Sequence, residues 1–285
     1  MGRSLAESRG AGTLGGVSEL TVAAVQIASS LDPAENREAL GIVEEVCASS
    51  PRPGLVVFPE VMMRDFGKPG SDVAGFAEDL DGPFVRRLTE LARAHDVTLV
   101  AGMFERSEDP TRPYNTLVVV DRGGLRASYR KIHLYDSFGY KESDRLVAGE
   151  VEPVVVEVGG LRVGLMTCYD LRFPELARAL VDRGAEVILL PAAWVAGPRK
   201  VDHWRTLLKA RAVENTVYVV AAAQPGPRYT GHSMAVTPHG EVVEAGDEDR
   251  FVTATLRRSL VDEVRAENPS LANRRIDPAG AGSVG

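Results

Sequence analysis

The sequence has few of the residues that mark several large classes of protein. Its 285 residues include two cysteines, Cys47 and Cys168, too few for a disulfide framework or a cysteine-based zinc site. Basic side chains number 33 against 40 acidic ones, and a net charge of −7 provides no excess of cations for nucleic acid or anionic lipid. No apolar run approaches the roughly 18 residues of a membrane span. We therefore expect neither nucleic acid nor a membrane as a partner.

The two ends of the chain differ in composition from the rest. Residues 1–18 contain Arg3 and Arg9 but no apolar stretch of about seven or more residues, so we do not expect them to act as a secretory signal. Together with the unpaired thiols, this predicts a protein of the reducing cytoplasm. Residues 1–18 and 278–285 are rich in Gly, Ala and Ser and are predicted to be flexible tails. Residues 19–277 contain no linker-like stretch, which predicts one domain.

Apolar runs alternate with amphipathic stretches between the tails, and this pattern predicts an α/β fold. Glycine pairs at Gly123-Gly124 and Gly159-Gly160, each between two apolar runs, predict two hairpins and therefore a mixed sheet. We expect strands over 20–27, 55–58, 97–103, 117–120, 125–131, 154–158, 161–167, 187–190, 217–223 and 252–256, a hairpin turn at 238–240, and helices over 33–47, 83–95, 175–183, 203–214 and 260–267.

Cys168 stands between the predicted strand 161–167 and the predicted helix 175–183. A thiol at such a turn can face a cleft, where backbone N–H groups favour its thiolate and can hold an oxyanion. The alternative is a small buried hydrophobic side chain, the usual state of a free cysteine. That alternative is our interpretation of Cys47, which lies on the apolar face of a predicted helix.

A cysteine nucleophile needs a base, usually a histidine. None of the five histidines has an informative sequence context. Glu60, which follows Pro59 at the end of a buried strand, and Lys131, at the end of another, are further candidates. Taken singly, each is more often a solvated charge at a strand end.

Three segments together resemble the Glu, Lys and Cys blocks of the nitrilase or carbon–nitrogen hydrolase superfamily. They are Phe58-Pro59-Glu60, Tyr129-Arg130-Lys131 and Cys168-Tyr169-Asp170-Leu171-Arg172-Phe173-Pro174-Glu175, in the family's order and spacing. The resemblance covers about residues 20–277. It implies that Cys168 is the nucleophile, Glu60 the general base and Lys131 the cation that stabilises the oxyanion. Glu142, in Tyr140-Lys141-Glu142-Ser143, matches the family's second glutamate, which supports the base and positions the substrate.

The resemblance also implies a fold and a reaction. The fold is a single-domain αββα sandwich with mixed sheets, pairing with a second subunit as αββα-αββα, so we expect a homodimer or a higher homo-oligomer. The reaction hydrolyses an amide to an acid and ammonia through a thioester on Cys168, with the N–H of Tyr169 as a second oxyanion donor. It requires no metal ion and no organic cofactor.

Within the superfamily, segments 203–212, 218–224 and 231–233 are most similar to the branch of deaminated glutathione amidases and ω-amidases. Substrates of that branch are small amides that carry a carboxylate. This suggests Arg172 as a carboxylate clamp, with a structural ion pair to Asp170 or Glu175 as an equal alternative. Trp194, where the branch usually has Phe, and the longer loop 197–202 can reshape the substrate pocket.

Other activities stay open from the sequence alone. An N-carbamoyl amino acid hydrolase or a true nitrilase would use the same residues on a different substrate. A catalytically silent scaffold would keep the fold and lose the chemistry. The presence of Glu60, Lys131 and Cys168 together argues against a scaffold.

Overall fold

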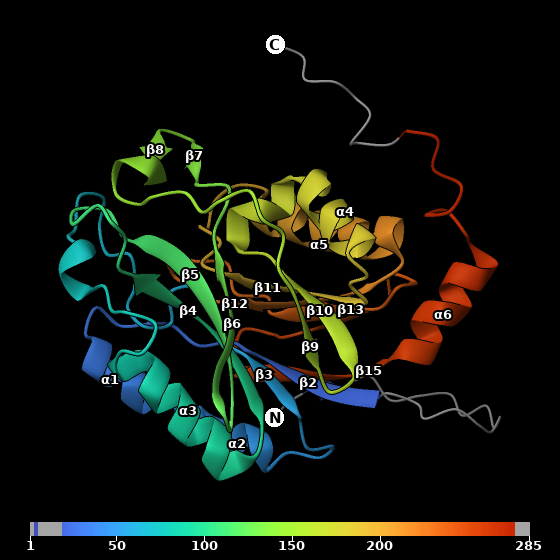
Figure 1. Ribbon diagram of the computed structural model, residues 1–285, viewed down its shortest axis with the longest axis horizontal. Coiled ribbons are helices and arrows are strands. Elements are labelled where there is room, and N and C mark those ends of the chain that lie inside the picture. The colour runs from blue at the N-terminus through green and yellow to red at the C-terminus, as the bar shows by residue number, and fades with distance from the viewer. Residues whose placement is uncertain (1–2, 5–18, 277–285) are drawn as a thin grey trace.

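Helices and strands alternate along the chain in the computed structural model, which describes residues 3–4 and 19–276 (Figure 1). The strands are β1 Arg3–Ser4, β2 Glu19–Val25, β3 Leu55–Val57, β4 Thr98–Glu105, β5 Tyr114–Asp121, β6 Gly124–Arg130, β7 Asp136–Ser137, β8 Tyr140–Lys141, β9 Val155–Val158, β10 Leu161–Leu165, β11 Val187–Ala192, β12 Tyr218–Ala223, β13 Met234–Val236, β14 Val242–Glu244 and β15 Phe251–Arg257. The α-helices are α1 Pro33–Ala39, α2 Ile42–Cys47, α3 Pro83–His95, α4 Pro174–Asp182, α5 Lys200–Asn215 and α6 Arg258–Glu267. Short 3₁₀ helices are η1 Ala74–Phe76, η2 Glu142–Asp144 and η3 Cys168–Arg172.

Two mixed sheets form the centre of the fold. The seven-stranded sheet has the order β1-β15-β2-β3-β4-β5-β6, and the six-stranded sheet has the order β14-β13-β12-β11-β10-β9. Strands β2, β3 and β4 are parallel in the first sheet, as are β10, β11 and β12 in the second. The glycine pairs join β5 to β6 and β9 to β10, so both predicted hairpins are confirmed.

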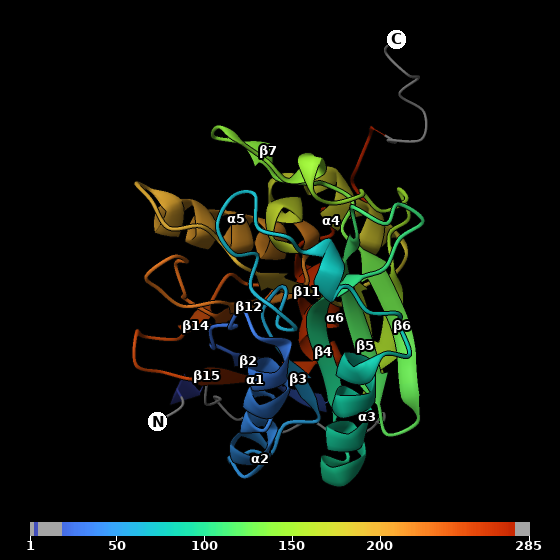
Figure 2. The ribbon, with the colours of Figure 1, turned by 90° about the vertical axis from the view of Figure 1, so that its left-hand side faces the viewer.

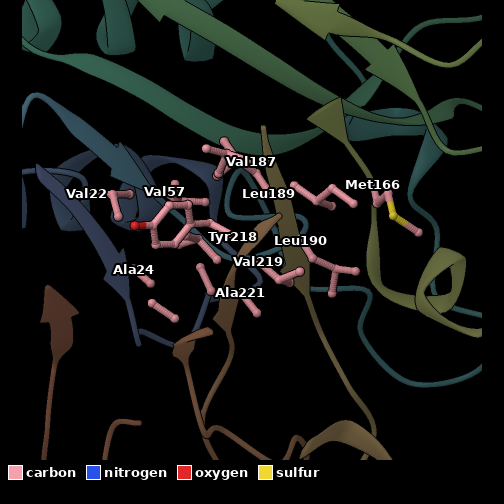
Figure 3. Close-up of a cluster of buried hydrophobic side chains, with 14 of the residues drawn as sticks. Val22, Ala24, Val57, Met166, Val187, Leu189, Leu190, Tyr218, Val219 and Ala221 are labelled. Carbon is pink, nitrogen blue, oxygen red and sulfur yellow. The ribbon is translucent and has the colours of Figure 1, made fainter. Parts of the chain in front are cut away.

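The alternation of side chains along the strands explains why the two sheets stack. In β2, Val22 and Ala24 belong to the buried cluster between the sheets, whereas Ala23 and Val25 belong to a second cluster on the opposite face. Figure 3 shows Val22 and other side chains of the first cluster, contributed by strands of both sheets. Both faces of β2 are thus buried, and each apolar face requires its own cover.

Helices cover the outer faces of the two sheets. Helices α1, α2 and α3 lie against the seven-stranded sheet, and α4 and α5 lie against the six-stranded sheet (Figures 1 and 2). The fold is therefore the αββα sandwich that the family resemblance implies. Among the described residues, no helix combines the length and apolar character needed to cross a membrane.

Some local features differ from the sequence prediction. The expected helix over 33–47 divides into α1 and α2 at Leu40 and Gly41, where glycine is a poor helix former. A small hairpin, β7–β8, was not predicted because its strands have two residues each. Within the predicted N-terminal tail, Arg3–Ser4 form β1 and pair in parallel with β15. The rest of that tail and the predicted tail 278–285 lie outside the described residues.

Candidate active site

Four predicted side chains meet where strands of both sheets end. Glu60 follows β3 and Cys168 follows β10, so each lies beyond the carboxyl end of a parallel strand, where α/β folds place their ligands. Lys131 comes directly after β6, and Glu142 is the first residue of η2. All four side chains are buried, which means that their charges interact strongly.

Lys131 joins the two carboxylates. Its Nζ lies 3.0 Å from Oε1 of Glu60 and 2.9 Å from Oε2 of Glu142. Glu60 is held further by Asn115, whose Nδ2 donates to Oε1 at 2.7 Å, and by the backbone N–H of Ala193, which donates to Oε2 at 2.7 Å. The Glu60 carboxylate therefore has a fixed position and orientation, as a base that takes a proton from a defined atom requires.

The backbone beside both reactive groups is unusual. Val61, next to Glu60, has φ of 48°, and Cys168 has φ of 47°, a region that residues with a side chain rarely adopt. The chain around Glu60 packs directly on β4, since a Cβ at Gly102 would lie 2.3 Å from the nitrogen of Val61. Strained backbone of this kind persists only where the surrounding structure enforces it, and it is concentrated at functional sites.

Burial and charge decide the protonation states at the site. Burial lowers the pKa of Lys131, but Glu142 and Glu60 outweigh it and raise that pKa well above its usual value, so the ammonium is retained. Burial and the neighbouring Glu60 raise the pKa of Cys168 well above its usual value. Burial likewise raises the pKa of Glu142.

The raised pKa of Cys168 corrects one sequence-based expectation. The sequence suggested that backbone N–H groups at the strand-to-helix turn favour the thiolate. Burial and the charge of Glu60 instead oppose ionisation of the thiol, and together they outweigh the opposite effect of Lys131. Nucleophilic attack by Cys168 therefore requires that a base remove its proton during the reaction.

Asp170 connects the cysteine turn to the segment that carries Lys131, a role that sequence reasoning missed. Its carboxylate accepts hydrogen bonds from the N–H of Thr167 at 2.8 Å, the hydroxyl of Tyr129 at 2.7 Å and the N–H of His133 at 3.1 Å. Tyr129 and His133 lie on either side of Lys131 in the chain. No signal in the sequence marked this role, because it depends on the complete burial of Asp170, which a sequence does not reveal.

A cavity of about 450 Å³ opens from these residues, a volume suited to a small molecule. The predicted residues Tyr169 and Trp194 line it together with the four buried groups. Among the hydrogen bonds of the described residues, none uses the N–H of Tyr169. The segment 197–202, which the sequence singled out as able to reshape the pocket, contributes Gly197, Pro198 and Lys200 to the lining. Other lining residues that the sequence did not single out include Phe66, Tyr135, Phe138, Tyr140, Arg228 and Tyr229.

Arg172 lies against the ring of a cavity-lining residue, Trp194. Its guanidinium carbon lies 5.0 Å from the centre of the Trp194 ring, and the described cavity wall includes Lys200 and Arg228 but not Arg172. Among the ion pairs of the described residues, none joins Arg172 to Asp170 or Glu175. The structural ion pair is therefore not formed among the described residues, and the carboxylate clamp stays a prediction.

The described residues provide no cluster of metal ligands. Among residues 3–4 and 19–276, no cluster of three or more His, Cys, Asp or Glu side chains could hold a metal ion. The polar groups of the cavity that the structure describes are the Glu60–Lys131–Glu142 cluster, Cys168 and further cations and hydroxyls at the wall.

This arrangement of fold and site defines a class of enzyme. Residues 21–266 match the family model of the carbon–nitrogen hydrolases, and the chain belongs to that family. It is therefore a hydrolase of carbon–nitrogen bonds, as the sequence motifs predicted. The mixed αββα sandwich agrees with that assignment.

Individual relatives place the chain among amidases. It is 41% identical over 225 residues to a deaminated glutathione amidase of Escherichia coli O157:H7, covering 79% of this chain and 86% of the relative. It is 34% identical to a 2-oxoglutaramate amidase of Paenarthrobacter nicotinovorans, over 96% of this chain and 93% of the relative. The crystal structure of Saccharomyces cerevisiae Nit3, a member of branch 10 of the nitrilase superfamily, matches with a TM-score of 0.79 and 29% identity, over 90% of this chain and 97% of that one.

Proposed function

We propose that the protein hydrolyses a small carboxylate-bearing amide to an acid and ammonia through a thioester on Cys168. The observation that carries the proposal is the buried arrangement of Glu60, Lys131 and Glu142 beside this thiol. A base, a cation and a nucleophile are the groups that amide hydrolysis requires. The relatives named deaminated glutathione amidase and 2-oxoglutaramate amidase support the substrate class.

The first half-reaction forms the thioester. Glu60 accepts the proton of the Cys168 thiol while the sulfur bonds to the amide carbon, and the carbonyl oxygen becomes an oxyanion. The Lys131 ammonium and the N–H of Tyr169 stabilise that charge. When the C–N bond breaks, the proton held by Glu60 passes to the leaving nitrogen, and ammonia departs.

The second half-reaction regenerates the enzyme. Glu60, now ionised again, accepts a proton from water as the water oxygen bonds to the thioester carbon. The bond from carbon to sulfur breaks, the acid leaves, and the proton returns from Glu60 to Cys168. Lys131 keeps its charge throughout because its two carboxylate partners favour the ammonium. Glu142 acts on the reaction by holding Lys131 in place.

An ammonia-release screen tests the proposed substrate class. Succinamate, glutaramate and 2-oxoglutaramate would be compared with the neutral amides butyramide and valeramide, with N-carbamoyl amino acids and with aliphatic nitriles. We expect kcat/KM for the carboxylate-bearing amides to exceed that for neutral amides of the same length by at least tenfold. Faster turnover of nitriles or carbamoyl compounds would instead assign the protein to one of the alternatives left open by the sequence.

We also propose that the chain works as a homodimer in the cytoplasm. The family resemblance implies pairing of two sandwiches, and Cys47 and Cys168 are both free, as a reducing compartment favours. Sedimentation equilibrium at micromolar concentration should give twice the 30.6 kDa mass of one chain. A mass of one chain across that concentration range would contradict the dimer.

A further inference from the structure

Lys200 is a cation of the cavity wall that the reaction does not use. It is the first residue of α5, which begins within the segment 197–202 that the sequence predicts as a loop, so that loop is shorter than predicted. Only 9% of the surface of Lys200 is exposed. Its backbone is fixed by Trp194, whose indole N–H donates to the carbonyl oxygen of Lys200 at 3.0 Å. This hydrogen bond fixes the backbone from which the Lys200 side chain extends, next to the cavity-lining residue Trp194.

Aromatic rings surround this ammonium. Lys200 Nζ lies 4.4 Å from the ring centre of Phe138, 5.3 Å from that of Tyr135 and 5.5 Å from that of Trp194. It also lies 3.3 Å from the hydroxyl of Tyr135. All three rings belong to residues that line the same cavity as Cys168. Such rings attract a cation but leave it without a counter-charge.

The other cations of the cavity are already paired. Lys131 contacts two carboxylates, and Nη1 of Arg228 lies 2.6 Å from Oδ1 of Asp65. Among the ion pairs of the described residues, none includes Lys200 or Arg172, although both lie against the ring of Trp194. Two neighbouring cations without an anion make a site that an anionic group of the substrate would stabilise.

We propose that the ammonium of Lys200 binds the carboxylate of the amide substrate and is thus the residue that sets the enzyme's preference for anionic substrates. Arg172 is then a positioning residue, which acts through its contact with Trp194 and adds positive potential behind that ring. Cys168 and Lys200 line the same cavity, so one small substrate can present its amide to the thiol and its carboxylate to the ammonium. The inference rests on the proposed amidase function and assigns the substrate contact within it.

Matched substrates and variants test the assignment. Succinamate and butyramide have the same chain length, but succinamate ends in a carboxylate and butyramide ends in a methyl group. In Lys200→Met we expect KM for succinamate to rise at least tenfold with kcat changed less than threefold, and kcat/KM for butyramide to stay within threefold of the wild type. Lys200→Arg should retain part of the preference because it keeps the charge. Lys209→Met removes an exposed charge from the same helix and should change neither substrate.

Direct binding provides a second measurement that does not depend on turnover. Calorimetric titration of succinamate into Cys168→Ala and into the double variant Cys168→Ala/Lys200→Met should show at least tenfold weaker binding to the latter. Unchanged binding would overturn the assignment. An equal loss for succinamate and butyramide in Lys200→Met would also overturn it, because Lys200 would then only shape the cavity.

Arg172 provides the competing outcome. If Arg172→Lys raises KM for succinamate tenfold while Lys200→Met does not, Arg172 is the carboxylate clamp and the assignment to Lys200 is wrong. Failure of the proposed function has a different signature. The wild-type enzyme would then show no preference for succinamate over butyramide, or no amide hydrolysis, before any variant is made.

Discussion

Replacing Cys168 with alanine should abolish amide hydrolysis while leaving the protein folded. The substitution removes the atom that forms the thioester, so turnover should fall by at least about three decades. The loss of one sulfur atom from a cavity wall costs little packing, and the unfolding temperature should change by no more than a few degrees. Ammonia release from a carboxylate-bearing amide, measured beside a thermal melt, tests both expectations.

Cys47 is the matched control for this variant. It is also a free, buried cysteine, but it lies in α2 and belongs to the second buried cluster, between the seven-stranded sheet and its helices. Cys47→Ala should therefore retain activity. Mass spectrometry of trapped enzyme should find an acyl adduct on Cys168 and none on Cys47. Residual activity above about one part in a thousand in Cys168→Ala would contradict the covalent route.

Glu60→Gln and Lys131→Met should each lower kcat by two or more decades. Glu60→Gln removes the group that takes the thiol proton, and the raised pKa of Cys168 leaves little thiolate to react without it. Lys131→Met removes a charge from the developing oxyanion, and losing such a donor typically costs about 2.7–4 kcal/mol of transition-state stabilisation. Steady-state kinetics at saturating substrate measures both effects.

Glu142→Gln distinguishes the two carboxylates. Glu142 contacts Lys131 through both oxygens and accepts the N–H of Tyr135 at 2.6 Å, which describes a supporting group. Its removal should therefore reduce kcat less than Glu60→Gln does. An equal reduction would show that the roles assigned to Glu60 and Glu142 are wrong.

Circular dichroism of each variant would separate a loss of catalysis from a loss of folding. This control matters most for Lys131→Met, which leaves two carboxylates buried without their cation.

The sequence predicted the reacting groups because they are carried by short contiguous motifs. The segments around Glu60, Lys131 and Cys168 have side chains whose chemistry is informative when taken together. Most strands and helices were also predicted, since buried strands leave continuous apolar runs and helices leave a 3.6-residue period. The boundary between α1 and α2 was missed because a glycine within an amphipathic pattern can either be tolerated or divide the helix.

The cavity wall could not be predicted in the same way. The sequence singled out Trp194 and the segment 197–202, which contains Lys200, but Arg228 and Tyr135 come from other segments far apart in the chain and have ordinary local sequences. Their importance arises from where the two sheets bring them, which local patterns do not encode. Arg172 shows a different limit of the sequence. Its spacing from Cys168 suggests a direct clamp, which stays a prediction, but that spacing does not reveal the contact of its guanidinium with the Trp194 ring.

The groups that hold Glu60 come from both sheets of the sandwich. Asn115 belongs to β5 of the seven-stranded sheet, whereas Ala193 follows β11 and Gln224 follows β12 of the six-stranded sheet. Glu60 is thus held by hydrogen bonds from both sheets, and the position of its carboxylate depends on how the two sheets pack against each other. Displacing a reacting group by about 1 Å can cost a hundredfold in rate. Substitutions deep between the sheets, at Val22 or Leu189, would therefore tune the catalytic rate through the alignment of the layers without touching the substrate.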